Sequence, residues 1–279
     1  MTSGLADIRR VGAIPWLLPL AAILLLFAAL PFLLTQWGHR LDPFTMDLDA
    51  VFRPPSLEFP FGTDAFGRCM VARFLLGLGL TLQALAVAVV TTFVLGVVLG
   101  VTAGWFHGRW PDRVFNWVAG LVYTVPFYLI AVAAAAILRP GLVGAFFILG
   151  LLAWAVSARL VRAEIIQLRS APFVLALRSA GFSEAFILFR VLLPMAVAPA
   201  LVSVVFFVPE LVGVEVGLSF FGLGARPPTP SLGRELYAGL AHAASAPWLV
   251  WFPAIGILLL VLTFFTLGFW LKRSLPFAR

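Results

Sequence analysis

The chain has 279 residues, of which 62% are hydrophobic and 11% are charged, and its mean hydropathy is +1.08. Soluble domains carry about 25% charged residues, so this chain has too little charge to cover a water-soluble globule. We expect lipid to solvate most of its surface. The same composition excludes a disordered or collagen-like chain, and the single cysteine, Cys69, excludes an internal disulfide.

The net charge of +7 does not indicate nucleic-acid binding, because the basic residues are dispersed along the chain. Of the 19 basic residues 18 are Arg, and Lys272 is the only Lys. In a membrane protein such an excess sets the orientation of the helices. We therefore expect membrane lipid, and no nucleic acid, around this chain.

Six runs with few or no charges are long enough to cross about 30 Å of hydrocarbon as helices. They are Val11–Leu41 with its apolar centre Ile14–Leu34, Phe74–Gly108, Val114–Leu138, Pro140–Ala158, Val191–Pro209 and Leu236–Leu271. None shows the alternation of a transmembrane strand. The sequence predicts an all-α membrane protein with six transmembrane helices. The first run follows Arg9 and Arg10, but no small-x-small cleavage site follows near Thr35, so we expect a retained anchor.

The Lys and Arg residues of alternate loops predict the orientation. Twelve lie in the N-terminus, the 107–113 turn, the 159–190 loop and the C-terminal tail. Seven lie in the 35–73 loop, at Arg139 and in the 215–246 loop. We therefore expect both termini and the 159–190 loop on the cytoplasmic side.

Glycines four residues apart in the second run predict a close helix contact. Gly96, Gly100 and Gly104 form two successive G-x-x-x-G steps, which let another helix approach closely. The alternative is that these glycines are scattered by chance in a Gly-rich chain.

The chain lacks the motifs of the common catalytic sites. It has no G-x-x-x-x-G-K-[ST] loop, so it cannot hydrolyse ATP by a P-loop mechanism. His39, His107 and His242 are far apart and do not pair with Cys69 at the spacing of metal ligands. Ser219 follows Gly217 without the second Gly of a nucleophile elbow. We expect no enzyme, no metal and no cofactor in this chain.

Two acids, Glu210 and Glu215, are predicted at the outer end of the fifth span. Ionisable groups in the bilayer are costly and commonly functional. One hypothesis is that one of them lines the outer mouth of a pathway and meets the amino group of a substrate. The alternatives are a pair with Arg226 or Arg234, or a position at the lipid headgroups. Proton-driven transport is disfavoured, because the spans hold so few ionisable groups.

The 159–190 loop is predicted to form a docking helix. Pro172 suits a first helical turn and Gly181 a helix end, with about two turns between them. Ser183 is predicted to cap a second helix that runs to Pro194. The alternative is an interfacial helix that lies on lipid. The candidate docking residues are Pro172, Leu175, Ala176, Leu177, Arg178, Gly181 and Ser183.

The segment 217–233 is apolar, then Gly-rich, then Pro-rich. Its Gly and Pro content argues against one continuous helix. Phe220, Phe221 and Leu223 are too apolar to remain in water, and the sixth span is expected to begin only near Trp248. We expect the segment to fold back against the outer ends of the spans. The alternative is a loose extracytoplasmic loop.

Several short motifs follow one another between about residues 61 and 253. The pattern G-T-D-x-x-G-R is met by Gly62, Thr63, Asp64, Gly67 and Arg68. L-S-F-L-G-L-G-x-x-P-P-x-P-S-x-G is met at Leu218, Ser219, Phe220, Gly222, Leu223, Gly224, Pro227, Pro228, Pro230, Ser231 and Gly233. A-P-W-x-x-x-F-P is met by Ala246, Pro247, Trp248, Phe252 and Pro253. In these motifs the chain resembles the dipeptide/oligopeptide/nickel class of ABC importer permeases, specifically the C-type subunit.

The cytoplasmic motif of that class, E-A-A-x-x-x-G, falls on Leu175, Ala176, Leu177 and Gly181, and its later I-x-x-x-x-x-L-P on Ile187, Leu193 and Pro194. Leu175 replaces the Glu that opens it. The other departures are Leu177 for Ala, Cys69 for Asp, Val191 for His and Met195 for Asn. We expect docking by shape and apolar contact rather than by a salt bridge at Leu175.

The resemblance implies a type I ABC importer permease fold, with a short cytoplasmic coupling helix and a folded-back segment before the last helix. The implied divisions are 1–34 for the first helix, 35–77 for an extracytoplasmic loop with an amphipathic segment, 78–271 for the core and 272–279 for a cytoplasmic tail. The implied partners are a sister (B-type) permease, two ATPase subunits or domains that hold ATP and Mg²⁺, and an extracytoplasmic solute-binding protein. The protein would lie in a bacterial inner membrane.

The resemblance also implies roles for the extracytoplasmic residues. The candidates for the translocation path or outer gate are Glu210, Glu215, Ser219, Phe220 and Phe221, and those for docking the binding protein are Pro227, Pro228 and Pro230. The function implied is import of short peptides. The alternatives are import of nickel, a metal chelate, glutathione or another small solute by the same machinery, a proton-coupled secondary transporter, and a membrane scaffold.

Overall fold

The computed structural model describes residues 29, 32–37, 41–138 and 141–275, so most of the first predicted span lies outside the described residues. Most of these residues are helical, and they hold no β-strand; Thr63 and Cys69 form one isolated bridge. In chain order the elements are η1 (Leu48–Ala50), α3 (Met70–Trp105), α4 (Trp110–Thr124), α5 (Phe127–Leu138), α6 (Gly141–Arg169), α7 (Pro172–Ser179), α8 (Glu184–Phe186), η2 (Ile187–Leu192), α9 (Leu193–Phe220), α10 (Leu232–Leu240) and α11 (Trp248–Ser274).

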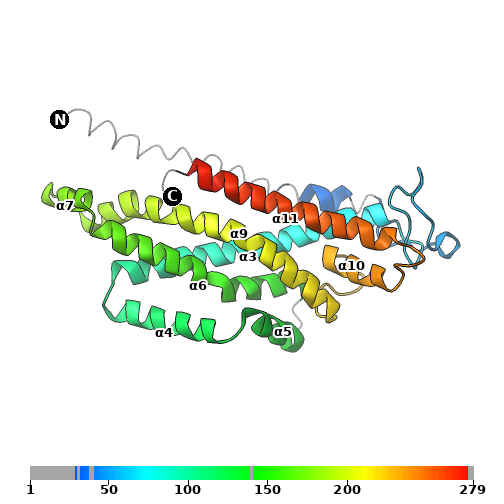
Figure 1. Ribbon diagram of the computed structural model, residues 1–279, viewed down its shortest axis with the longest axis horizontal. Helices are drawn as coiled ribbons and strands as arrows, with labels where there is room; N and C mark the ends of the chain where they lie inside the picture. The colour runs from blue at the N-terminus through cyan, green and yellow to red at the C-terminus, as the bar shows by residue number, and fades with distance from the viewer. Residues whose placement is uncertain (1–28, 30–31, 38–40, 139–140, 276–279) are drawn as a thin grey trace.

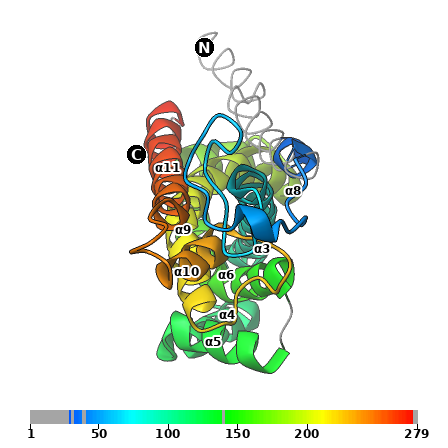
Figure 2. The same ribbon diagram turned by 90° about the vertical axis from the view of Figure 1, so that its right-hand side faces the viewer.

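The long helices form an elongated bundle (Figure 1). Helices α3, α6, α9 and α11 run along its length, and α4 and α5 lie along one side. The short helix α7 projects at one end of the bundle and α10 packs at the other. Figure 2 looks along the bundle from the end that carries α10, with α11 and the α4–α5 pair on opposite sides. We call these two ends the α7 end and the α10 end.

Four helices are long and apolar enough to cross a membrane: α3, α6, the continuous stretch Glu184–Phe220 and α11. The α4–α5 pair makes a fifth if it is counted as one span. The prediction of an all-α membrane protein is therefore confirmed, with four or five of the six predicted spans inside the described part of the chain.

The third predicted span, Val114–Leu138, is not one straight helix. It breaks between α4 and α5 with a bend of 81°. Pro126 lies in the break. A proline has no N–H to continue the ladder and disfavours the helical conformation of the residue before it, here Val125. The sequence analysis missed this bend because it searched only for charges.

Three other boundaries differ from the predictions. Helix α6 continues to Arg169, so Arg159 and Arg162 are helical and do not lie in a loop. The helix that Ser183 caps does not stop at Pro194, because α8, η2 and α9 follow one another without a break. The run Leu236–Leu271 is interrupted before α11, where Pro247 is the N-cap residue.

The predicted glycine seam is confirmed as a contact between α3 and α6. A Cβ atom on Gly96 would lie 2.0 Å from Ser157 Oγ, and one on Gly100 would lie 2.5 Å from the Ala158 carbonyl oxygen. At those distances no side chain fits, so only glycine allows this approach. Because α6 thereby packs on the backbone of α3, the two helices form the centre of the bundle.

Candidate functional site

At the α7 end the chain makes a short helix with well-defined limits. Pro172 occupies its first turn. Beyond its last residue Gly181 has a φ of +84°, the left-handed region that favours glycine. The Gly181 N–H donates to Arg178 O at 3.0 Å, and the Phe182 N–H donates to Leu177 O at 3.1 Å. These two bonds are a Schellman motif, so the predicted helix and its Gly stop are confirmed as structure.

One side of helix α7 packs against the bundle, and the other side is exposed. Val174 is fully buried against Ile165 of α6 and Ile187. Leu175 is 54% exposed and Ala176 is exposed. The α7 end therefore presents an apolar surface where the related class has a Glu.

The charged residue of α7 already has a partner. Arg178 Nε and Nη2 donate to the Glu184 carboxylate at 2.8 and 3.1 Å. These bonds raise the pKa of Arg178. Ser183 Oγ accepts the Phe186 N–H at 3.2 Å, so it caps the next helix as predicted. The ion pair and the cap hold the link between α7 and α9.

A buried carboxylate joins the α3–α4 turn to α6, which the sequence analysis did not predict. Arg162 Nε donates to Asp112 Oδ1 at 2.6 Å, and His107 Nδ1 lies 2.8 Å from Asp112 Oδ2. The Gly108 N–H adds a bond of 2.9 Å. Arg162 is 50 residues from Asp112, so no local spacing reveals this link. It fixes α4 to α6 near the α7 end.

At the α10 end the G-T-D-x-x-G-R motif folds into a compact loop. Thr63 Oγ1 donates to Ala50 O at 2.5 Å. Asp64 accepts from the Arg68 backbone N–H at 3.0 Å and from Arg68 Nε at 2.7 Å. Gly62 and Gly67 have φ values of +71° and +70°. A Cβ atom on Gly67 would lie 1.7 Å from the carbonyl oxygen of Asp47. The geometry of the loop therefore requires glycine at this position of the motif.

Other parts of the chain hold this loop in place. Trp248 at the start of α11 donates from Nε1 to Thr63 O at 3.1 Å. Arg73 of α3 is buried and binds Glu235 of α10 with two N–O distances of 3.0 and 2.7 Å. The motif loop, α3, α10 and α11 therefore form one packed unit at the α10 end.

Glu215 is buried in the last turns of α9, which continues to Phe220, beyond the predicted limit of this span at Pro209. Its carboxylate accepts from Ser231 Oγ at 2.6 Å, from Ser219 Oγ at 3.3 Å and from the Gly233 N–H at 3.2 Å. All three donors are neutral. Glu215 thus binds the segment that precedes α10 back onto α9.

The segment 217–233 folds back, but its first residues still belong to helix α9. Helix α9 includes Phe220 and ends in the cap of Phe221. Gly222 then has a φ of +70° and starts the reversal that returns the chain to Ser231. Phe220 and Phe221 are exposed, as are Pro227 and Pro228, which are joined by a cis peptide bond; Pro230 is buried.

An open cavity of about 430 Å³ lies where α4 and α5 break. Val125, Pro126 and Phe127 of the break line it together with Ser157 of α6. From α9 the lining runs from Ser203 to Glu210. The polar side chains on an otherwise apolar wall come from several helices, as in a small-molecule site.

The structure separates the two acids that the sequence analysis paired. Glu210 is exposed on the cavity wall, and within the described residues it has no hydrogen bond or ion pair. Glu215, by contrast, is buried and satisfied away from the cavity. Only Glu210 can meet a molecule in the cavity.

Comparison with known proteins supports the resemblance. Residues 96–276 match the family described as the binding-protein-dependent transport system inner membrane component. The chain belongs to this family. The match covers the glycine seam, α7, α10 and most of the cavity lining, whereas the G-T-D-x-x-G-R loop and the start of α3 lie before it.

Three relatives are similar to this permease over most of their length. A dipeptide transport system permease protein of Alkalihalophilus pseudofirmus is 35% identical over 79% of this chain and 72% of its own. A glutathione transport system permease protein of Pectobacterium atrosepticum is 31% identical over 90% of this chain and 84% of its own. A putative peptide transport system permease protein of Brucella suis is 33% identical over 88% and 82%. This protein is thus a multi-pass membrane permease and not a catalytic subunit.

Proposed function

We propose that this permease forms half of the membrane channel of an ATP-driven importer of short peptides. The observation that carries the proposal is the cavity at the α4–α5 break, with the carboxylate of Glu210, which has no partner among the described residues, on its wall. A carboxylate in an apolar cavity suits the ammonium group of a peptide. The relatives named for dipeptide and glutathione transport support this substrate class.

The two ends of the bundle suit different partners. The exposed apolar surface of α7, with Leu175 and Ala176, would seat a cytoplasmic ATPase subunit that holds ATP and Mg²⁺. The exposed Phe220, Phe221, Pro227 and Pro228 at the α10 end would form the outer gate and the seat of a solute-binding protein. A sister permease would close the cavity from its open side. In this proposal the α7 end lies in the cytoplasm.

Glutathione is the second candidate substrate, because one relative is named for its transport. It also carries a free ammonium group, so Glu210 would serve both substrates. The test is ATP-driven uptake by the complete importer in proteoliposomes, with trialanine and glutathione as substrates. Uptake of neither substrate in the presence of ATP and the binding protein would overturn the proposal.

A further inference from the structure

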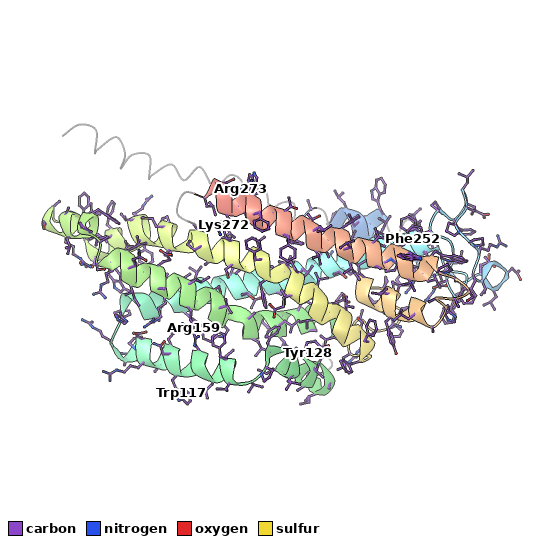
Figure 3. The ribbon with its side chains drawn as sticks, viewed as in Figure 1. Trp117, Tyr128, Arg159, Phe252, Lys272 and Arg273 are labelled. Carbon is purple, nitrogen blue, oxygen red and sulfur yellow. The ribbon has the colours of Figure 1, made fainter. Side chains whose placement is uncertain are left out.

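We propose that Arg159 binds the substrate's terminal carboxylate at the opposite end of the cavity from Glu210, so that the permease favours peptides with both ends free. This inference rests on the proposed function and adds a substrate contact to it. Figure 3 shows Arg159 on α6 in the space towards α4, whereas Trp117 lies on the outer side of α4.

The position of Arg159 follows from its contact with Tyr123. The guanidinium carbon lies 4.0 Å from the centroid of the Tyr123 ring. Tyr123 lines the cavity, and so does Val156, which precedes Arg159 by three residues on the same face of α6. The guanidinium group therefore lies against the ring that lines the cavity.

Arg159 is free to bind an anion. It is exposed, and among the described residues no carboxylate pairs with it. Stacking on an aromatic ring occupies the face of a guanidinium group and leaves the N–H donors of its edge available. Those donors match a carboxylate in two parallel bonds.

The two charges lie at opposite ends of the cavity. Helix α6 runs towards the α7 end and α9 runs away from it. Ser157 is thus the lining residue of α6 nearest the α7 end, and Glu210 is the lining residue of α9 nearest the α10 end. From Ser203 to Glu210 the rise of α9 is about 10 Å. An extended tripeptide is also about 10 Å long.

In a membrane protein, the positions of charged side chains such as Arg159 and Glu210 indicate where a water-filled path lies. An unpaired Arg or Glu facing lipid is costly, and such residues usually face a water-filled path. A zwitterionic peptide would present its ammonium group to Glu210 and its carboxylate to Arg159. The arrangement therefore favours linear peptides, which carry both charges, over solutes that carry only positive or only negative charge.

The alternative role for Arg159 is structural. Tyr123 is in the last turn of α4, where a positive charge stabilises the exposed carbonyl groups. The experiment therefore needs a readout that loss of this stabilisation would not move. The ratio of trialanine uptake to trialanine amide uptake, measured at saturating loaded binding protein, supplies it, because a structural loss lowers both rates by the same factor.

The test uses the complete importer in proteoliposomes with trialanine. We expect Arg159→Gln to lower the maximal uptake rate about tenfold, equivalent to about 1.4 kcal/mol, with no change in the half-saturating concentration of loaded binding protein. Arg159→Lys should recover most of the rate, because an ammonium group also binds a carboxylate. Arg113→Gln removes an exposed charge from α4 and serves as the matched control.

Three results would overturn the inference while leaving the proposed function intact. The first is wild-type uptake of trialanine by Arg159→Gln. The second is an equal loss with Arg159→Gln and Arg159→Lys, which indicates a structural role of the stacked ring. The third is an equal fractional loss of trialanine and trialanine amide uptake in Arg159→Gln, because the amide has no carboxylate for Arg159 to bind. If wild-type importer takes up no trialanine, the proposed function itself fails.

Discussion

Arg73 and Glu235 are 162 residues apart in the chain, and their side chains form a buried two-point ion pair. Arg73 is 2% exposed and Glu235 is 6% exposed. Arg73 also donates to Pro43 O at 3.2 Å and lies 3.7 Å from the Asp64 carboxylate. One side chain therefore connects the start of α3, the motif loop and α10.

Breaking this pair from one side should destabilise the permease strongly. Arg73→Met leaves the Glu235 carboxylate buried without its partner, a loss of about 3–5 kcal/mol. Thermal unfolding of the purified protein measures the effect. The double variant with Glu235→Leu should recover much of the loss, since it leaves no unpaired charge. A double variant as unstable as the single one would contradict this account.

The glycine seam predicts opposite effects for two Gly→Ala changes in helices. Gly100→Ala places a methyl group 2.5 Å from the Ala158 carbonyl oxygen and should cost about 1–3 kcal/mol. Gly120→Ala meets nothing within 4 Å, so it should be neutral or stabilising by up to about 1 kcal/mol. Unfolding measurements on both variants test this, and equal effects would rule out the seam.

The left-handed backbone conformation of Gly181 limits which residues can replace it. Gly181→Val should cost about 1–2 kcal/mol at this backbone position and disturb the helix stop. We expect ATP-driven uptake to fall about tenfold while membrane insertion stays normal. Gly181→Asn is the control, since Asn adopts this conformation more readily. Normal uptake by the Val variant would count against a docking role for α7.

We expect the hydrogen bonds of Glu215 to hold the folded-back segment against α9. Glu215→Ala removes the acceptor of Ser231 and of the Gly233 N–H. Hydrogen exchange across 221–233 should then accelerate about tenfold or more, because two buried hydrogen bonds are lost and each contributes about 0.5–1.5 kcal/mol. Glu210→Gln, on the cavity wall, should leave this exchange unchanged. Rapid exchange of the segment in the wild-type assembled complex would refute the fold-back.

The orientation can be tested by reporter fusions. We expect reporters at Arg279 and near Pro228 to lie in opposite compartments, with Arg279 in the cytoplasm. The reason is that the segments predicted on the same side as Arg279 carry twelve of the Lys and Arg residues. Activity of both reporters in the same compartment would exclude the proposed topology.

The fold class and the short motifs were predictable because they depend on local chemistry. The stop at Gly181 and the cap at Ser183 each need only a few neighbouring residues. Where a charge was used as the boundary of a span, the predicted span was too short. Arg159 was placed in a loop and lies in α6, beside an aromatic ring. Glu215 was placed at the outer end of a span that stopped at Pro209, but α9 continues to Phe220 and holds Glu215 among neutral donors.

Contacts between distant elements could not be predicted from one sequence. The pairs Asp112–Arg162 and Arg73–Glu235 join residues whose spacing carries no periodic signal. The cavity was missed for a related reason. It exists because the α4–α5 break opens a gap against α6 and α9, and the sequence marks that break only by Pro126.

The contact of α3 with α6 also limits how the permease can move. At Gly96 the backbone of α3 lies against Ser157, and at Gly100 it lies against the Ala158 carbonyl oxygen, so there is little room for one packing to be exchanged for another. We therefore expect α3 and α6 to move together as one rigid unit, and α7 to move with them through the contacts of Val174. Bending is expected instead at the α4–α5 break and at the π-helical turn η2, whose backbone ladder is irregular. A displacement of α7 would then rotate the α6 wall of the cavity relative to the α4–α5 wall.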